Sequence, residues 1–98
     1  MKSTREIGSE ILFEILEEGA YANLLLNKSL PGISEQRDRA FVTNLVYGTL
    51  HRLTPIDFQI SQFLQKPVKK KDAMLQVLLR SAFFEILYSG AKPHAVVN

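Results

Sequence analysis

The sequence predicts an all-α domain. Apolar residues recur at three- and four-residue spacings along most of the 98 residues, and no useful stretch alternates with period two. Caps, glycines and prolines divide the apolar segments into five expected helices. With 46% hydrophobic and 22% charged residues, the chain has the composition of a globular protein, and its length suffices for one hydrophobic core. We therefore expect one helical bundle over residues 1–98.

The first expected helix covers about residues 4–18. Ser3 and Glu6 have the spacing of a capping box, and apolar residues follow at four-residue intervals. Gly19 stands where a left-handed residue commonly ends a helix. A shorter helix is expected over residues 20–29, where a Leu-Pro-Gly sequence breaks it.

The third expected helix is the longest. Ser34 is its predicted N-cap, and its apolar stripe continues for about five turns as far as Leu53. Gly48, in the middle, costs about 1 kcal/mol relative to alanine, so we expect another helix to approach closely there. Thr54 is then the predicted N-cap of a fourth helix, with Pro55 at its first position.

The fourth helix should end before Pro67, and Asp57 should complete its N-terminal capping. Four of its apolar residues are expected to face the core: Ile56, Ile60, Phe63 and Leu64.

Asp72 is the predicted cap of the fifth helix, which Gly90 and Pro93 end. Apolar residues nearly encircle this helix, so we expect other helices to surround it and make it the core of the domain. Its polar strip consists of Gln76, Arg80, Ser81 and Glu85. If Arg80 is buried, a carboxylate on another helix is the favoured partner, and Glu85 is the alternative.

The composition excludes several classes of site. Without cysteine there is no disulfide, thiolate nucleophile or sulfur-ligated zinc, and His51 and His94 lie far apart without a metal-ligand pattern. The glycines are isolated, so no glycine-rich loop is available for a phosphate or a cofactor. We predict no catalytic, cofactor-binding or metal-binding residue. No apolar run approaches the roughly 18 residues of a membrane span, and we expect a cytoplasmic protein.

Charge is distributed unevenly. Residues 1–51 contain five basic and seven acidic side chains, whereas residues 52–98 contain seven basic and three acidic ones. The second half therefore has the charge that suits an anionic partner.

Several stretches together resemble NusB-like domains, particularly those fused to 16S ribosomal RNA cytosine-C5 methyltransferases of the Sun (Fmu) type. The first is DRAFVTNLVYGTLHR at residues 38–52, and the others are Ile56-Asp57 with FLQKPV at 63–68, LLR through FEILY at 78–88, and KPHAVVN at 92–98. Their order and spacing cover nearly the whole chain.

The resemblance implies a NusB-like, antitermination-factor helical bundle that contacts ribosomal RNA ahead of an S-adenosylmethionine-dependent methyltransferase domain. In the family this bundle continues for another helix or two, which implies that the chain is a fragment truncated before the last helices. The transferase chemistry uses cysteines and a glycine-rich loop that this chain lacks. The fragment is therefore not expected to be an enzyme. A free-standing NusB-type transcription antitermination factor remains an alternative parent.

Six basic residues are candidates for RNA contact. Four lie in the connection between the fourth and fifth helices, and two begin the first helix: Lys66, Lys69, Lys70 and Lys71, with Lys2 and Arg5. Lysines in such a loop can neutralise phosphates, although many lysine-rich loops are merely solvated. For Lys2 and Arg5 an ordinary surface role is favoured, because four glutamates at four-residue spacing make one face of that helix acidic.

Other candidates have structural interpretations. His51 suits the C-terminal dipole of the third helix, and His94 belongs to a turn. Tyr21, Tyr47 and Tyr88 are expected to pack in the core. The rival functional hypothesis is a protein-interaction module that docks on its own methyltransferase domain or another protein, with possible self-association of the fragment.

Overall fold

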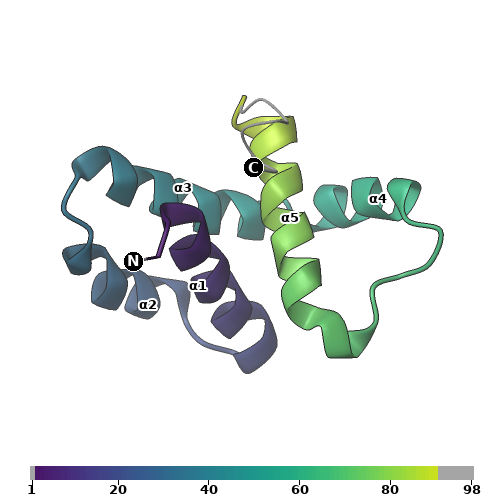
Figure 1. Ribbon diagram of the computed structural model, residues 1–98, viewed down its shortest axis with the longest axis horizontal. Coiled ribbons are helices and arrows are strands. Elements are labelled where there is room, and N and C mark those ends of the chain that lie inside the picture. Colours follow the sequence, from purple (N-terminus) through teal and green to yellow (C-terminus); the bar gives the residue numbers. More distant parts are fainter. Residues whose placement is uncertain (1, 91–98) are drawn as a thin grey trace.

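The computed structural model describes residues 2–90, and this part of the chain contains helices and no strand (Figure 1). The α-helices are α1 (Thr4–Glu18), α2 (Ala22–Ser29), α3 (Gln36–His51), α4 (Leu53–Phe63) and α5 (Ala73–Tyr88). Two short 3-10 helices are η1 (Leu30–Gly32) and η2 (Lys70–Asp72). The all-α prediction is confirmed. The expectations for Pro93, His94 and the rest of the last stretch lie outside the described residues.

Helix α5 lies between two groups of helices (Figure 1). On one side α1, α2 and α3 pack together, and α1 and α3 both contact α5. On the other side α4 extends away from α3 and packs against α5. No helix in the described part is long and apolar enough to cross a membrane.

Two apolar clusters hold this arrangement. The larger one joins α1, α2 and α3 to the first turns of α5, and its buried members are Ile11, Leu12, Leu26, Ile33, Val42, Val46 and Val77. The smaller one joins α3 and α4 to the last turns of α5 through Leu45, Ile56, Ile60 and Phe84. Because α5 contributes to both clusters, it connects the two parts of the core.

The ends of α1 form as its sequence predicts. The Ser3 hydroxyl accepts a hydrogen bond from the Glu6 amide at 3.1 Å, and the Ser3 amide donates to the Glu6 carboxylate at 3.4 Å. Gly19 follows the helix with a φ of +74°. The capping box and the left-handed glycine both depend on residues that are close together in the sequence, so the sequence suffices to predict them.

The boundaries around α2, α3 and α4 differ from the prediction. Helix α2 begins at Ala22 rather than residue 20, and Glu35, not Ser34, is at the N-cap of α3 without a side-chain capping bond. Arg52 leaves the helical conformation at φ −125° and ψ 26°, so α3 ends at His51, two residues before the predicted end of its apolar stripe at Leu53. Leu53 consequently belongs to α4.

The predicted capping of α4 is wrong. Thr54 and Pro55 lie inside the first turn, and Asp57 does not cap the backbone, because its carboxylate pairs with Arg80. At α5, Asp72 does occupy the N-cap position, although its side chain makes no capping hydrogen bond.

Two burial predictions for α4 are also wrong. Ile56 and Ile60 are buried, but Phe63 is 74% exposed and Leu64 is 36% exposed. The Phe63 ring packs edge-to-face on Phe83 with 5.6 Å between centroids, and the rest of it faces outward. The last turn of α4 therefore meets α5 through this ring contact and leaves most of the Phe63 side chain in solvent.

Helix α5 is not surrounded within the described part of the chain, contrary to the prediction. Four residues of the helix are buried: Val77, Ser81, Phe84 and Glu85. Other apolar residues of the same helix are exposed: Leu75, Leu78, Ile86 and Leu87. The close approach predicted at Gly48 is confirmed, because a Cβ there would overlap the ring of Phe84.

Candidate nucleic-acid interface

The chain between α4 and α5, residues 64–72, places four lysines on the surface; we call this segment the basic loop. Lys66, Lys69, Lys70 and Lys71 are all exposed. Val68 is half-buried, and together with Leu64 and Pro67 it lines a hollow of about 460 Å³ beside α4 and the first turns of α5. These residues attach the loop to the helices while the lysines point into solvent.

Three of the lysines share one short turn. Asp72 donates its backbone N–H to the Lys69 carbonyl at 2.8 Å, which closes η2 over Lys70 and Lys71. This turn places the three lysines at consecutive exposed positions just before α5. Among residues 2–90 none of the four lysines forms an ion pair. Clustered cations without carboxylate partners are available to an external anion.

Phe63 adds an aromatic ring at the edge of the basic loop. It ends α4 just before the loop and is 74% exposed. We predicted it in the core because its spacing from Ile56 and Ile60 fits one helical face. Exposed rings beside cations suit unpaired nucleotides, since every base has a face that can stack on them. The proline that follows at Pro67 indicates an end of the helix nearby, which is the one sequence signal that could have suggested this exposure.

The two N-terminal candidates make contacts within the chain. Lys2 Nζ donates to the Glu10 carboxylate at 2.7 Å. This hydrogen bond and the negative charge of Glu10 raise the pKa of Lys2. Both side chains are largely exposed, so this pair contributes little to stability.

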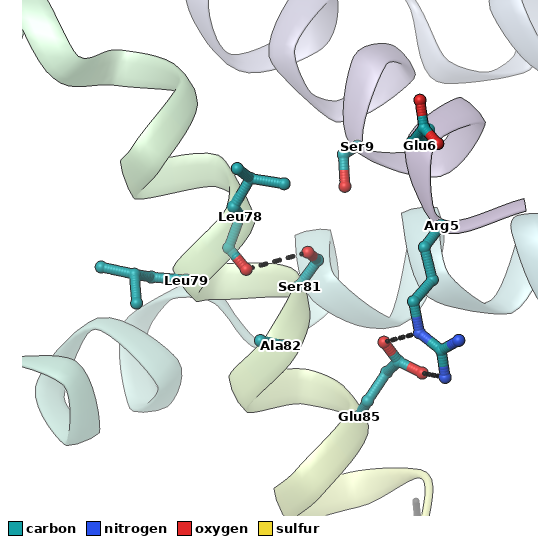
Figure 2. Close-up of a pocket in the computed structure, with 8 residues that line it drawn as sticks. All are labelled: Arg5, Glu6, Ser9, Leu78, Leu79, Ser81, Ala82 and Glu85. Atoms are coloured by element: carbon teal, nitrogen blue, oxygen red, sulfur yellow. Dashed lines mark hydrogen bonds and ion pairs between the residues drawn. The ribbon is translucent and has the colours of Figure 1, made fainter. Parts of the chain in front are cut away.

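Arg5 makes the longest-range ion pair of the described chain (Figure 2). Its Nε and Nη2 donate to the two carboxylate oxygens of Glu85 at 3.0 and 2.9 Å. The guanidinium also lies 5.4 Å from the ring centroid of Phe41. The Glu85 side chain is only 4% exposed, whereas that of Arg5 is 43% exposed. Arg5 therefore joins the start of α1 to the end of α5.

Arg80 has the structural role that we favoured for it. Its Nε and Nη2 donate to the Asp57 carboxylate at 2.8 and 2.9 Å, so its partner comes from α4. Glu85, the alternative partner, is occupied by Arg5. Eighty residues separate Arg5 from Glu85, and no local spacing reveals that pair.

The aromatic candidates are divided between core and surface. Tyr47 is half-buried and packs against the larger cluster, but Tyr21 is 72% exposed, so its predicted place in the core is wrong. Tyr88 is 42% exposed, stacks on Phe84 and has the Arg52 guanidinium 4.7 Å from its ring centroid.

His51 is the last residue of α3 and is exposed, and its ring centroid lies 6.0 Å from that of Tyr47. His94 lies outside the described residues.

Two of the glycines within residues 2–90 lie where helices pack closely. Gly8 and Gly48 face the side chains of Leu45 and Phe84, so they serve helix packing and form no cradle for a cofactor. No group of three or more histidines or carboxylates that could hold a metal comes together in this part. We assign no step of methyl transfer to these residues.

Comparison with known proteins places the chain in a family. The model of the NusB family matches residues 2–98. No solved structure matches the chain significantly.

Among curated proteins, the ribosomal RNA small subunit methyltransferase B of Xanthomonas campestris pv. campestris is 29% identical over 96 residues, covering 98% of this chain and 22% of that protein. The probable ribosomal RNA small subunit methyltransferase B of Bacillus subtilis is 36% identical over 88 residues, covering 88% of this chain and 19% of that protein. The ribosomal RNA small subunit methyltransferase B of Proteus mirabilis is 27% identical over 93 residues. The chain thus spans about a fifth of the length of these relatives.

The family match covers nearly the whole chain. The stretches on which the resemblance rested lie on α3, α4, the basic loop and α5, except the last stretch, which lies outside the described residues. The chain belongs to the NusB family.

Proposed function

We propose that this chain is the non-catalytic RNA-binding part of a ribosomal RNA cytosine-C5 methyltransferase, in which the basic loop contacts ribosomal RNA. The methyl transfer would take place in a further domain that binds S-adenosylmethionine, and the protein would act in the cytoplasm, where ribosomes are made. The family and the names of the relatives support this assignment.

The observation that carries the proposal is which basic side chains form ion pairs or hydrogen bonds within the described part of the chain and which do not. Arg5, Arg80 and Lys2 are paired with carboxylates, and Arg39 donates to the carbonyls of Ile33 and Ser34. The four lysines of the basic loop lack such partners in the described part of the chain. Binding there releases the counterions of the RNA and does not require the protein to break an ion pair of its own.

Lysines of this kind supply affinity more than sequence choice. Their contacts go to phosphates, which are the same for every sequence. Phe63 would add stacking with an unpaired base, worth about 1–3 kcal/mol in proteins that bind single strands. The preferred target is therefore a single-stranded or looped region of ribosomal RNA.

Replacing Lys69, Lys70 and Lys71 together with glutamine should weaken RNA binding and reduce its salt dependence. For single strands the slope of log K against log salt is about −0.7 per neutralised phosphate, so losing three contacts should make the slope shallower by about 2. Fluorescence anisotropy with a small-subunit ribosomal RNA fragment, titrated at several salt concentrations, measures this slope.

Lys28→Gln provides the matched control, because Lys28 is exposed in the last turn of α2 and lies outside the basic loop. It should leave the slope unchanged. Equal slopes for the unmodified chain and the triple variant, or no salt-sensitive binding at all, would remove the basis for RNA contact at this loop. RNA binding that depends on Phe63→Ala but not on the lysines would assign recognition to stacking instead.

A protein-interaction module remains the second candidate, and the exposed flank of α5 is the observation that favours it. Its docking partner would be the methyltransferase domain of the same protein. The triple glutamine variant separates the two functions, because it should lose RNA and keep a protein partner bound on α5.

A further inference from the structure

The hollow beside the basic loop has the features of a small binding site. Its volume is about 460 Å³, and small-molecule pockets commonly measure about 300–1,000 Å³. Its apolar wall includes Leu64, Pro67 and Val68, which belong to the basic loop. We call it the loop hollow, and four polar residues also line it: Asp57, Ser61, Gln65 and Gln76.

The loop hollow lies where α4, the basic loop and α5 meet. Gln76 is the α5 residue that lines it, and Arg80, about one turn further along α5, is paired with Asp57 of α4. The exposed Leu78 lies about 160° around the helix from Gln76. The described residues therefore form the hollow on the side of α5 that α4 occupies, away from Leu78.

Two polar groups of the loop hollow can only accept hydrogen bonds from a ligand. The Asp57 carboxylate accepts two bonds from Arg80 at 2.8 and 2.9 Å, and each of its oxygens keeps a further lone pair. The Ser61 hydroxyl donates its proton to the Phe58 carbonyl at 2.6 Å, so its oxygen is left as an acceptor. A ligand that fills the hollow must therefore supply hydrogen-bond donors of its own.

Two glutamines add groups that both donate and accept. Gln76 is half-buried in α5, and Gln65 is exposed in the basic loop. Within residues 2–90 neither carboxamide forms a hydrogen bond to another side chain or to the backbone. A carboxamide presents a donor and an acceptor side by side, which is the pattern that binds the edge of adenine.

The charges around the loop hollow suit a nucleotide. Lys66 stands between Gln65 and Pro67, and Lys69 follows Val68, so exposed ammonium groups flank the apolar wall. A base in the hollow would have its phosphates near these lysines. Because Arg80 balances the charge of Asp57, the carboxylate repels such phosphates only weakly.

We propose that the loop hollow binds one unpaired nucleobase of the RNA and selects the bases that carry an exocyclic amino group, adenine, cytosine and guanine, over uracil. The amino group would donate to Asp57 or Ser61, and the Gln76 carboxamide would bind the neighbouring atoms of the base edge. Uracil has no amino group, and its carbonyl oxygens would face the acceptors of the hollow.

This inference rests on the proposed RNA contact of the basic loop, and it adds a choice of sequence that phosphate contacts cannot give. Proteins hold a base that has left its stack in the same way, with apolar side chains against its faces and hydrogen bonds to its edge. The apolar wall and the polar lining of the loop hollow supply both kinds of contact.

Four RNA hairpins that differ only in one bulged nucleotide test the proposal by fluorescence anisotropy. The hairpin with a bulged uridine should bind roughly tenfold more weakly than the hairpins with adenosine, cytidine or guanosine. The slope of log K against log salt should be the same for all four, because they carry the same phosphates.

Asp57→Asn should remove most of this preference, since the asparagine amide can donate to a uracil carbonyl while its oxygen still accepts from Arg80. Changing Gln65 and Gln76 together to leucine should weaken binding of the adenosine hairpin severalfold and leave the uridine hairpin unchanged. Gln59→Leu is the matched control, because Gln59 is a half-buried glutamine of α4 that does not line the hollow. If circular dichroism shows that Asp57→Asn lowers the helix content, the glutamine variant decides the test.

The possible failures are distinguishable. If none of the four hairpins binds in a salt-sensitive way, both the RNA contact of the basic loop and the base site are wrong. Salt-sensitive binding with equal affinity for the four hairpins would overturn the base site alone. A preference against uridine that the glutamine variant keeps unchanged would also overturn it, because the base would then be read elsewhere on the chain.

Discussion

Replacing Arg5 with methionine should lower the free energy of unfolding by about 2–3 kcal/mol, because it leaves a buried carboxylate without its partner. Glu85 is 4% exposed on its side chain and accepts both of its hydrogen bonds from Arg5. Methionine keeps much of the apolar stem of arginine, so the loss reports mainly on the ion pair. Urea unfolding followed by circular dichroism measures the change.

The unequal exposure of the two partners makes a sharper prediction. Glu85→Gln should cost less than Arg5→Met, since the Arg5 side chain is 43% exposed and water can solvate the guanidinium when its partner is lost. The double variant Arg5→Met with Glu85→Leu should recover part of the stability, because it removes both charges together. If Arg5→Met proved neutral, the pair would have no part in joining α1 to α5.

Replacing Gly48 with alanine should destabilise the fold by about 1–3 kcal/mol, although alanine is the better helix former. The added Cβ would overlap the ring of Phe84, which belongs to the smaller apolar cluster and is 3% exposed. Phe84 cannot move outward without opening the contact between α3 and α5. Thermal and urea unfolding should both show the loss.

Gly32→Ala is the matched control for this steric explanation. No atom lies within 4 Å of a Cβ at Gly32, and its φ is not positive. This substitution should be neutral or slightly stabilising, because it removes freedom only from the unfolded chain. Phe84→Leu should restore part of the stability of Gly48→Ala by making room. Equal effects at Gly48 and Gly32 would show that backbone freedom, and not contact with Phe84, explains the glycine.

The predicted elements that the structure confirms depend on contacts close in sequence. The capping box at Ser3, the left-handed Gly19 and the bounds of α1 involve residues a few positions apart. The predicted boundary between α3 and α4 is wrong because the apolar stripe of α3 continues in the sequence into the start of α4. The apolar spacing passes through Arg52 without interruption, so the sequence joins Leu53 to the wrong helix.

The candidate interface could be predicted in part. Four lysines within six residues, in a connection between helices, are visible in the sequence, and the structure places them on one exposed loop. Phe63 was missed because helical spacing shows which residues share a face but not whether another helix covers that face. Its exposure follows from the tertiary packing, in which only Phe83 of α5 makes a ring contact with it within the described part of the chain.

The amino-acid sequence by itself determined the helical class, the family resemblance and the position of the basic loop, because these depend on periodicity, short motifs and local charge. The tertiary structure alone decided which cations are free. Arg5 and Lys70 are both cations in the sequence, but Arg5 meets a buried carboxylate 80 residues away, while no carboxylate in the described part of the chain pairs with Lys70. The same holds for the apolar residues of α5, since burial depends on which helices lie nearby, and that is a property of packing across the whole chain.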